Sequence, residues 1–377
     1  MKTHGIASLA EFLDDRVVYR NLEPQDRRLP GLKQIGSMTG LPAGSIPRKA
    51  EAAYGAVITE ILKKAQQIDH PDLPIKNMVF IGDTRLNDGT SFQNICIAGG
   101  WPGVAFIGSE TSQPESIQLD DHFDLPLYTA NRWSCLTDFP QVCKQHGIRI
   151  QQDTAVIFDL DKTSLGARGR NDKAIDRART KAGKDTIRKI IGDSFNESLF
   201  NESYPLFNQV SMHPFTTDNQ DYLVYLSLLA CAEFIKAEAL VEFVKRGVWK
   251  DFNAFAETVN SQKMNLSQEI QPVQNDFYAC LQNGDPTPFK SFRRQEYLNT
   301  IAAMQHDSIG ELEPDDLENT IFITEEVRQF GLYCKDRGAL LFGLSDKPDE
   351  ASLPTEELAA QGYLPLHRSM MTAVSLT

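Results

Sequence analysis

Two aspartates two residues apart follow an apolar segment near the middle of this chain. Residues 155–158 are all apolar, and Asp159, Asp161 and Thr163 follow them. Such a segment predicts a buried strand, so the carboxylates would emerge at its C-terminal end, where open α/β sheets bind ligands. Alternate residues of a strand point the same way, and carboxylates held that close need a shared cation or proton. We therefore expect a functional site here; the alternative is two solvated acids at a strand end.

Two further apolar segments end in polar residues. Residues 78–81 lead through a glycine to Asp83, with Asp88 in the same loop, and residues 339–344 end at Ser345. Because parallel strands bring their C-terminal ends to one edge of a sheet, these groups are expected to converge. Carboxylate oxygens are ligands that Mg²⁺ prefers. The predicted metal ligands are Asp83, Asp88, Asp159 and Asp161.

The spacing of apolar residues predicts which elements hold these groups. Helices and strands alternate before and after the paired aspartates, which is typical of a parallel α/β sheet. Residues 1–45 predict irregular structure, and residues 370–376 predict an edge strand. The predicted helices are 48–67, 90–98, 135–146 and 325–337, and the predicted strands are 78–81, 104–107, 155–158 and 339–344.

The region after the paired aspartates has a different pattern. Residues 166–321 contain helical windows without convincing strands, and the most apolar window, 221–245, predicts one long central helix. We therefore predict an α/β domain with a parallel sheet from residues 1–165 and 322–377. An all-α domain, residues 166–321, would be inserted into it.

Composition excludes several classes of function. The net charge of −13 argues against broad electrostatic binding to nucleic acid or to anionic membranes. The six cysteines include no Cys-x-x-Cys pair, which argues against structural zinc and a disulfide framework. There is no signal-like N-terminus and no apolar stretch of about 18 residues. We expect a cytoplasmic protein with neither nucleic-acid nor membrane partners.

Together these motifs resemble those of the haloacid dehalogenase-like phosphohydrolase superfamily. The resemblance implies that the α/β domain is a Rossmann-like core with a parallel sheet in a three-layer α/β/α arrangement. The run Asp159-Leu160-Asp161-Lys162-Thr163 is similar to the first motif of that family. The resemblance implies that Asp159 is the nucleophile, that Asp161 is the general acid/base, and that Thr163 belongs to the phosphate-binding loop. Ser345, in LLFGLSDKP, is similar to the second motif, which implies a hydrogen bond to the phosphoryl group.

The other two motifs lie earlier in the chain. Lys49, at the start of a predicted helix, resembles the basic residue of the third motif, with Arg48 as the alternative. The run from Gly82 to Asp88 resembles the fourth motif. This implies that Asp83 is a metal ligand and that Asp88 contacts a metal-bound water or the lysine.

The order of the motifs differs from that of the family. They run third, fourth, first, second, which is one rotation of the usual order and resembles a circular permutation. Such a rearrangement is tolerated when the original termini lie close together at the surface. The helical region 166–321 then stands where the family carries its first type of cap domain. Arg168 and Arg170, at its start, could contact an anionic group of the substrate; a solvated linker is the alternative reading.

The resemblance implies a Mg²⁺-dependent phosphatase that acts on a small phosphorylated metabolite through an aspartyl-phosphate on Asp159. The acid at Asp161 favours transfer of the phosphoryl group to water or to a sugar hydroxyl. A phosphomutase with the same site is an alternative. A non-catalytic regulatory protein that binds metal or phosphate is another.

Overall fold

The computed structural model describes residues 1–42, 44–304 and 314–376, and it divides into two compact units. The first, which we call the α/β unit, comprises Met1–Arg177 and Thr300–Thr377. The second, the helical unit, comprises Ala178–Asn299. The division lies inside the predicted boundaries at 166 and 321. The flanking segments are bonded within the α/β unit, as when the amide of Gly166 donates to the carbonyl of Phe322 over 2.8 Å.

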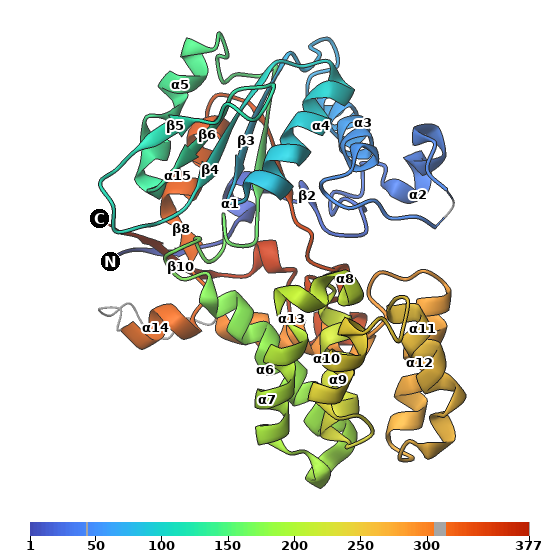
Figure 1. The fold of residues 1–377 in the computed structure, drawn as a ribbon. Helices are drawn as coiled ribbons and strands as arrows, with labels where there is room; N and C mark the ends of the chain where they lie inside the picture. Colours follow the sequence, from blue (N-terminus) through green and yellow to red (C-terminus); the bar gives the residue numbers. More distant parts are fainter. Residues whose placement is uncertain (43, 305–313, 377) are drawn as a thin grey trace. The chain divides into compact units, whose positions relative to one another are not determined.

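A seven-stranded sheet forms the centre of the α/β unit (Figure 1). The strands lie in the order β2-β9-β7-β3-β4-β6-β5, and neighbours run parallel except β5 and β6, which are antiparallel. This confirms the predicted α/β class with a mostly parallel sheet. The strands are β2 (Val17–Val18), β3 (Asn77–Gly82), β4 (Gly103–Gly108), β5 (Ile117–Leu119), β6 (Leu127–Ala130), β7 (Thr154–Asp159) and β9 (Leu340–Leu344).

Helices cover both faces of this sheet (Figure 1). Side chains of alternate residues in β7 point to opposite faces of the sheet. Ala155 and Ile157 belong to the apolar cluster that includes α3 and α4. On the other face, the ring of Phe158 lies 5.2 Å from that of Phe12 and 6.2 Å from that of Phe330. Burial on both faces explains why the strand is apolar throughout. The covering helices are α3 (Ala52–Asp69) and α4 (Thr90–Gly99) on one face, and α1 (Ala10–Leu13), α5 (Phe139–Gln145) and α15 (Glu325–Lys335) on the other.

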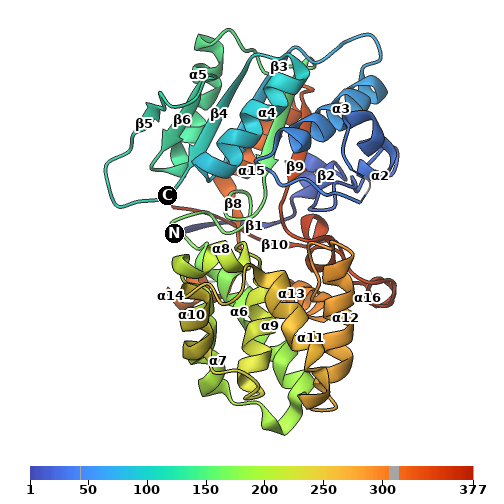
Figure 2. The same ribbon diagram turned by 45° about the vertical axis from the view of Figure 1, so that its right-hand side comes forward.

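A second, three-stranded sheet joins the two ends of the chain (Figure 2). Its order is β1-β10-β8, where β1 is Lys2–Ala7, β8 is Ile323–Thr324 and β10 is Met371–Ser375. Two predictions were therefore wrong. Residues 1–45 contain the strands β1 and β2, the helix α1 and a short helix α2 (Leu32–Ile35), and β10 is the central strand of its sheet, not an edge.

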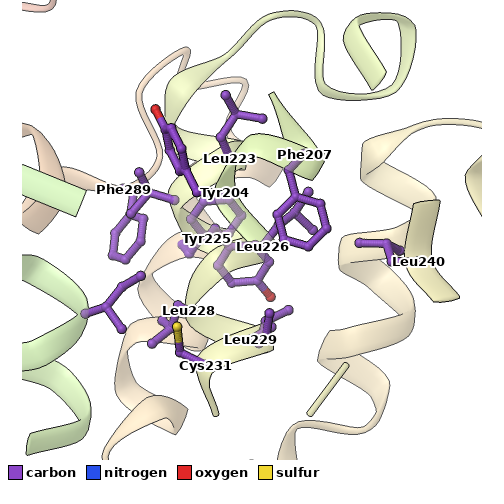
Figure 3. Packing of buried hydrophobic residues seen from close by; sticks show 14 of the residues in the cluster. Tyr204, Phe207, Leu223, Tyr225, Leu226, Leu228, Leu229, Cys231, Leu240 and Phe289 are labelled. Atoms are coloured by element: carbon purple, nitrogen blue, oxygen red, sulfur yellow. The ribbon is translucent and has the colours of Figure 1, made fainter. Parts of the chain in front are cut away.

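The described part of the helical unit consists of helices around α9 (Gln220–Cys231), which is buried on almost every side. Figure 3 shows Leu223, Tyr225 and Leu226 of α9 within the cluster that also contains Phe207 and Leu240. The single helix predicted over 221–245 was wrong, because α9 ends at Cys231 and α10 (Ala237–Lys245) follows. Glu233, between them, has a left-handed φ of 55°, which an α-helix cannot contain.

The remaining helices complete both units. No helix of the described residues is long and apolar enough to span a bilayer. Further helices are α6 (Lys173–Ile191), α7 (Glu197–Phe207), α8 (His213–Thr216), α11 (Phe252–Ser261), α12 (Ile270–Gln282), α13 (Lys290–Ala303), α14 (Pro314–Asn319) and α16 (Glu356–Ala360).

Candidate active site

The register of the three central strands aligns the predicted site residues along one edge of the sheet. Asp159 of β7 pairs with Leu344 of β9, and Phe158 pairs with Ile81 of β3. Ser345 and Asp83 therefore follow immediately on either side of the Asp159 strand. Neighbouring strands lie about 4.8 Å apart, so side chains at these ends are within reach of one another.

Lys49 is the centre of the charge network. Its ammonium lies 2.6 Å from Oδ1 of Asp88 and also contacts Oδ1 of Asp159, and its side chain is 2% exposed. Burial alone would lower the pKa of Lys49, but the charges of Asp159 and Asp88 outweigh it and hold the pKa well above its usual range. Arg48 is exposed at the surface. Of the two basic residues considered for the third motif, only Lys49 contacts the carboxylates.

Asp88 stabilises the loop after β3 as well as binding Lys49. Its Oδ2 accepts from the amides of Asp83 (3.1 Å) and Thr84 (2.9 Å) and from the hydroxyl of Thr84 (2.7 Å). Burial raises its pKa, but Lys49 and these hydrogen bonds prevail, and the pKa lies below its ordinary value. Gly82 is needed here because a Cβ would lie 2.6 Å from that of Asp88. Both carboxylate oxygens of Asp88 are thus already bonded.

Asp83 faces the same cluster and contacts a second cation. Its Oδ2 lies 2.5 Å from Nε of Arg168. Burial and the nearby charge of Asp88 raise the pKa of Asp83 to about 7, although Arg168 opposes the shift. The single arginine contact therefore does not fully compensate this buried carboxylate.

Asp83, Asp88 and Asp159 form a cluster of carboxylates that could hold a metal ion. One oxygen from each lies within 4.8 Å of the others, and all three residues are buried. Burial, followed by the repulsion of Asp88 and Asp83, raises the pKa of Asp159 well above its ordinary value despite the contact with Lys49. Oxygen donors of this kind fit a hard divalent cation such as Mg²⁺. The donor set by itself does not identify the metal.

The loop after β7 is folded back on itself. The Asp159 carbonyl accepts from the Ser164 hydroxyl over 2.7 Å, and Lys162 has a left-handed φ of 66°. Asp161 is half-buried, and its carboxylate is not part of the clustered triad among the described residues. The Thr163 hydroxyl is buried without a hydrogen-bond partner in the described part of the chain. A buried, unsatisfied hydroxyl is available to a ligand oxygen.

Ser345 is buried at the end of β9. Its amide donates to the Val18 carbonyl over 3.0 Å, so the short strand β2 fixes the backbone at this point. Its hydroxyl oxygen accepts from the Lys347 amide over 3.0 Å, which leaves the hydroxyl proton for another acceptor. Ser345 thus keeps a buried hydroxyl proton at the sheet edge where Asp159 and Asp83 also lie.

The two arginines predicted to bind substrate have different surroundings. Arg170 is 3% exposed, and its NH2 lies 2.8 Å from Glu110 and 2.8 Å from Glu326. Arg170 therefore supports the loop that carries it. Arg168 is 36% exposed and reaches Asp83, which the sequence did not suggest.

Sequence reasoning also missed Tyr54, in the first turn of α3. The side chain is 1% exposed, and its hydroxyl has no hydrogen-bond partner among the described residues. Burial raises the pKa of this phenol, and the charge of Lys49 opposes the shift. An aromatic residue on the apolar face of a helix ordinarily predicts core packing, so no sequence signal distinguished it.

Comparisons with family models, with curated proteins and with solved structures find no match to this chain.

Proposed function

We propose that this protein is a Mg²⁺-dependent phosphohydrolase of the haloacid dehalogenase-like type that forms an aspartyl-phosphate on Asp159. One observation carries the proposal: the ammonium of Lys49 joins Asp159 to Asp88 at the edge of the sheet where Asp83 and Ser345 also lie. The order and spacing of the motifs support the same proposal. The proposed substrate is a small phosphorylated metabolite.

The contacts suggest separate roles for the carboxylates. Lys49 binds Oδ1 of Asp159, which leaves Oδ2 as the nucleophile. Asp88 already accepts from Lys49, from two amides and from a hydroxyl, whereas the carboxylates of Asp83 and Asp159 each contact one cation. We therefore assign metal coordination to Asp83 and Asp159, and the lysine-partner role to Asp88. When bound, Mg²⁺ would neutralise phosphoryl and carboxylate charge and help to align the phosphoryl group.

The proposed reaction has two steps. Oδ2 of Asp159 forms a bond to phosphorus as the bond from phosphorus to the leaving oxygen breaks, and that oxygen takes a proton from Asp161. Water then attacks the phosphorus of the aspartyl-phosphate and gives a proton to Asp161. The bond from phosphorus to Oδ2 of Asp159 breaks, so phosphate leaves and the Asp159 carboxylate is restored. Lys49, Ser345 and Thr163 would stabilise the phosphoryl oxygens and the charge on Asp159.

A comparison of two aspartates at opposite ends of the same strand tests this proposal. Asp159→Asn should abolish phosphate release from a panel of sugar, nucleotide and small organic phosphates with Mg²⁺. Asp153→Asn is the matched control, because Asp153 is buried just before β7 and pairs with Lys76 over 3.2 Å, away from the site. The control should keep its activity.

The possible outcomes separate the candidate functions. Equal activity in Asp159→Asn and the wild type would rule out the proposed nucleophile. If activity required a sugar bisphosphate, the mutase alternative would replace hydrolysis. The wild type could instead release no phosphate from any compound and still bind beryllium fluoride in an Asp159-dependent way. The hypothesis of a non-catalytic regulatory protein would then replace the phosphohydrolase proposal.

A further inference from the structure

The side chain of Arg168 contacts a carboxylate that the proposed function assigns to the metal ion. Nε lies 2.5 Å from Oδ2 of Asp83, and the side chain is 36% exposed, so the residue that contacts this buried carboxylate is itself partly open to solvent. A divalent ion coordinated by Asp83 would meet this positive charge next to the same carboxyl group. Like charges at such separations repel by several kcal/mol, even at an effective dielectric constant of about 20.

The backbone that carries Arg168 is firmly held. Its amide donates to the Lys162 carbonyl over 2.8 Å, and its carbonyl accepts from the Glu110 amide over 2.8 Å. Gly169 has a φ of 78°, and a Cβ at this position would lie 2.1 Å from the Glu110 carbonyl oxygen. The buried ion pairs of Arg170 hold the next residue. The guanidinium can therefore leave Asp83 by side-chain rotation, without movement of the loop.

The three clustered carboxylates and the two cations that contact them balance in charge only in certain combinations. Asp83, Asp88 and Asp159 carry three negative charges when ionised, and Lys49 and Arg168 carry two positive charges. A divalent cation added to this set creates a surplus of positive charge, which a phosphoryl group would reverse. The displaced guanidinium would then have a new anionic partner at the mouth of the site, because guanidinium forms strong bonds with phosphate oxygens.

We propose that Mg²⁺ displaces Arg168 from Asp83 and that the released guanidinium binds the phosphoryl group of the substrate. This inference rests on the proposed function, because it takes Asp83 as a metal ligand. Arg168 then occupies the metal position in the resting protein and makes substrate binding dependent on metal binding. It is a residue that changes partner during binding, in contrast to Arg170.

Calorimetric titration of Arg168→Gln with Mg²⁺ and with inorganic phosphate tests the exchange. Removing the competing cation should tighten Mg²⁺ binding about tenfold, the size of one charged hydrogen bond. With Mg²⁺ saturating, phosphate should bind about tenfold more weakly than to the wild type. If Arg168 had only a structural role, the substitution would weaken both Mg²⁺ binding and phosphate binding. Tighter Mg²⁺ binding together with weaker phosphate binding therefore distinguishes the exchange from a structural role.

Two more variants make the result decisive. Arg85→Gln removes an arginine that pairs with Asp120 from the same loop as Asp83, and both affinities should be unchanged. Arg168→Lys keeps a cation in case the Gln variant does not fold, and its shorter reach should give intermediate Mg²⁺ affinity. Mg²⁺ binding to Arg168→Gln that is equal to or weaker than binding to the wild type would overturn the exchange of partners, and so would unaltered phosphate binding. Neither result would contradict the metal site. Absence of Mg²⁺ binding in every variant, wild type included, would overturn the metal site itself.

Discussion

Replacing Lys49 by methionine would leave the carboxylates of Asp88 and Asp159 buried without their shared cation. Breaking a buried ion pair from one side typically costs about 3–5 kcal/mol, because the remaining charge keeps its desolvation penalty. In a unit of this size, that corresponds to a fall of roughly 10 °C in the melting temperature. The pKa of Lys49 is held well above its usual range, so the wild-type pairing persists across neutral pH.

The free energy of unfolding lost in Lys49→Met should increase as the pH rises. An acid whose pKa is higher in the folded than in the unfolded state holds more protons when folded, so stability falls as pH rises between the two values. Without Lys49 this interval widens for Asp159, and the pKa of Asp88, which Lys49 helps to hold below its ordinary value, rises above that value. The deficit of Lys49→Met relative to the wild type should therefore grow between about pH 5 and about pH 8.

Tryptophan fluorescence can follow the unfolding of the α/β unit, which contains Lys49. Trp101 and Trp133 lie in the α/β unit and Trp249 lies in the helical unit, so a Trp249→Phe background reports on the α/β unit alone. Lys76→Met is the control, since Lys76 is 60% exposed in its pair with Asp153 and its loss should cost less than about 1 kcal/mol. A Lys49→Met protein as stable as the wild type at about pH 8 would refute the reasoning.

Two further substitutions probe the immediate surroundings of Lys49. Gly82→Ala would place a Cβ 2.6 Å from that of Asp88, so we expect a loss of about 1–3 kcal/mol in chemical denaturation, together with lost phosphate release. Gly36→Ala is the control, because a Cβ at Gly36 would meet only a leucine side chain, at 3.3 Å. Wild-type stability and phosphate release in both variants would contradict the packing argument. Tyr54→Phe removes a buried hydroxyl that has no partner among the described residues, so the unfolding free energy should stay the same or rise by up to about 1 kcal/mol; a measured destabilisation would show that the hydroxyl is bonded.

The strands that carry the site could be predicted because they are buried on both faces. The apolar runs at 78–81 and 155–158 correspond to β3 and β7, and the polar residues after them lie at the predicted edge. The choice between Lys49 and Arg48 could not be made from sequence, since it depends on which side chain is buried against Asp88 and Asp159. Burial of Lys49 and exposure of Arg48 decide it.

Other features lacked a local signal. The strand β2 has only two residues, too few for any periodicity, and it is held by its parallel neighbour β9. The break after α9 contains no glycine or proline, so the sequence continued to predict a helix. The contact between Arg168 and Asp83 joins residues 85 positions apart in the sequence, and it depends on how a loop is anchored to Glu110.

The small sheet also links the chain ends to the nucleophile loop. β1 pairs with β10 from Lys2↔Ser375 onward, and Val374 of β10 pairs with Thr324 of β8. The Thr324 hydroxyl in turn donates to the Thr163 carbonyl over 2.5 Å. A change in β1 or β10 would therefore act on a scaffold that reaches the loop of Asp159, although both strands lie more than 150 residues from that loop in the sequence.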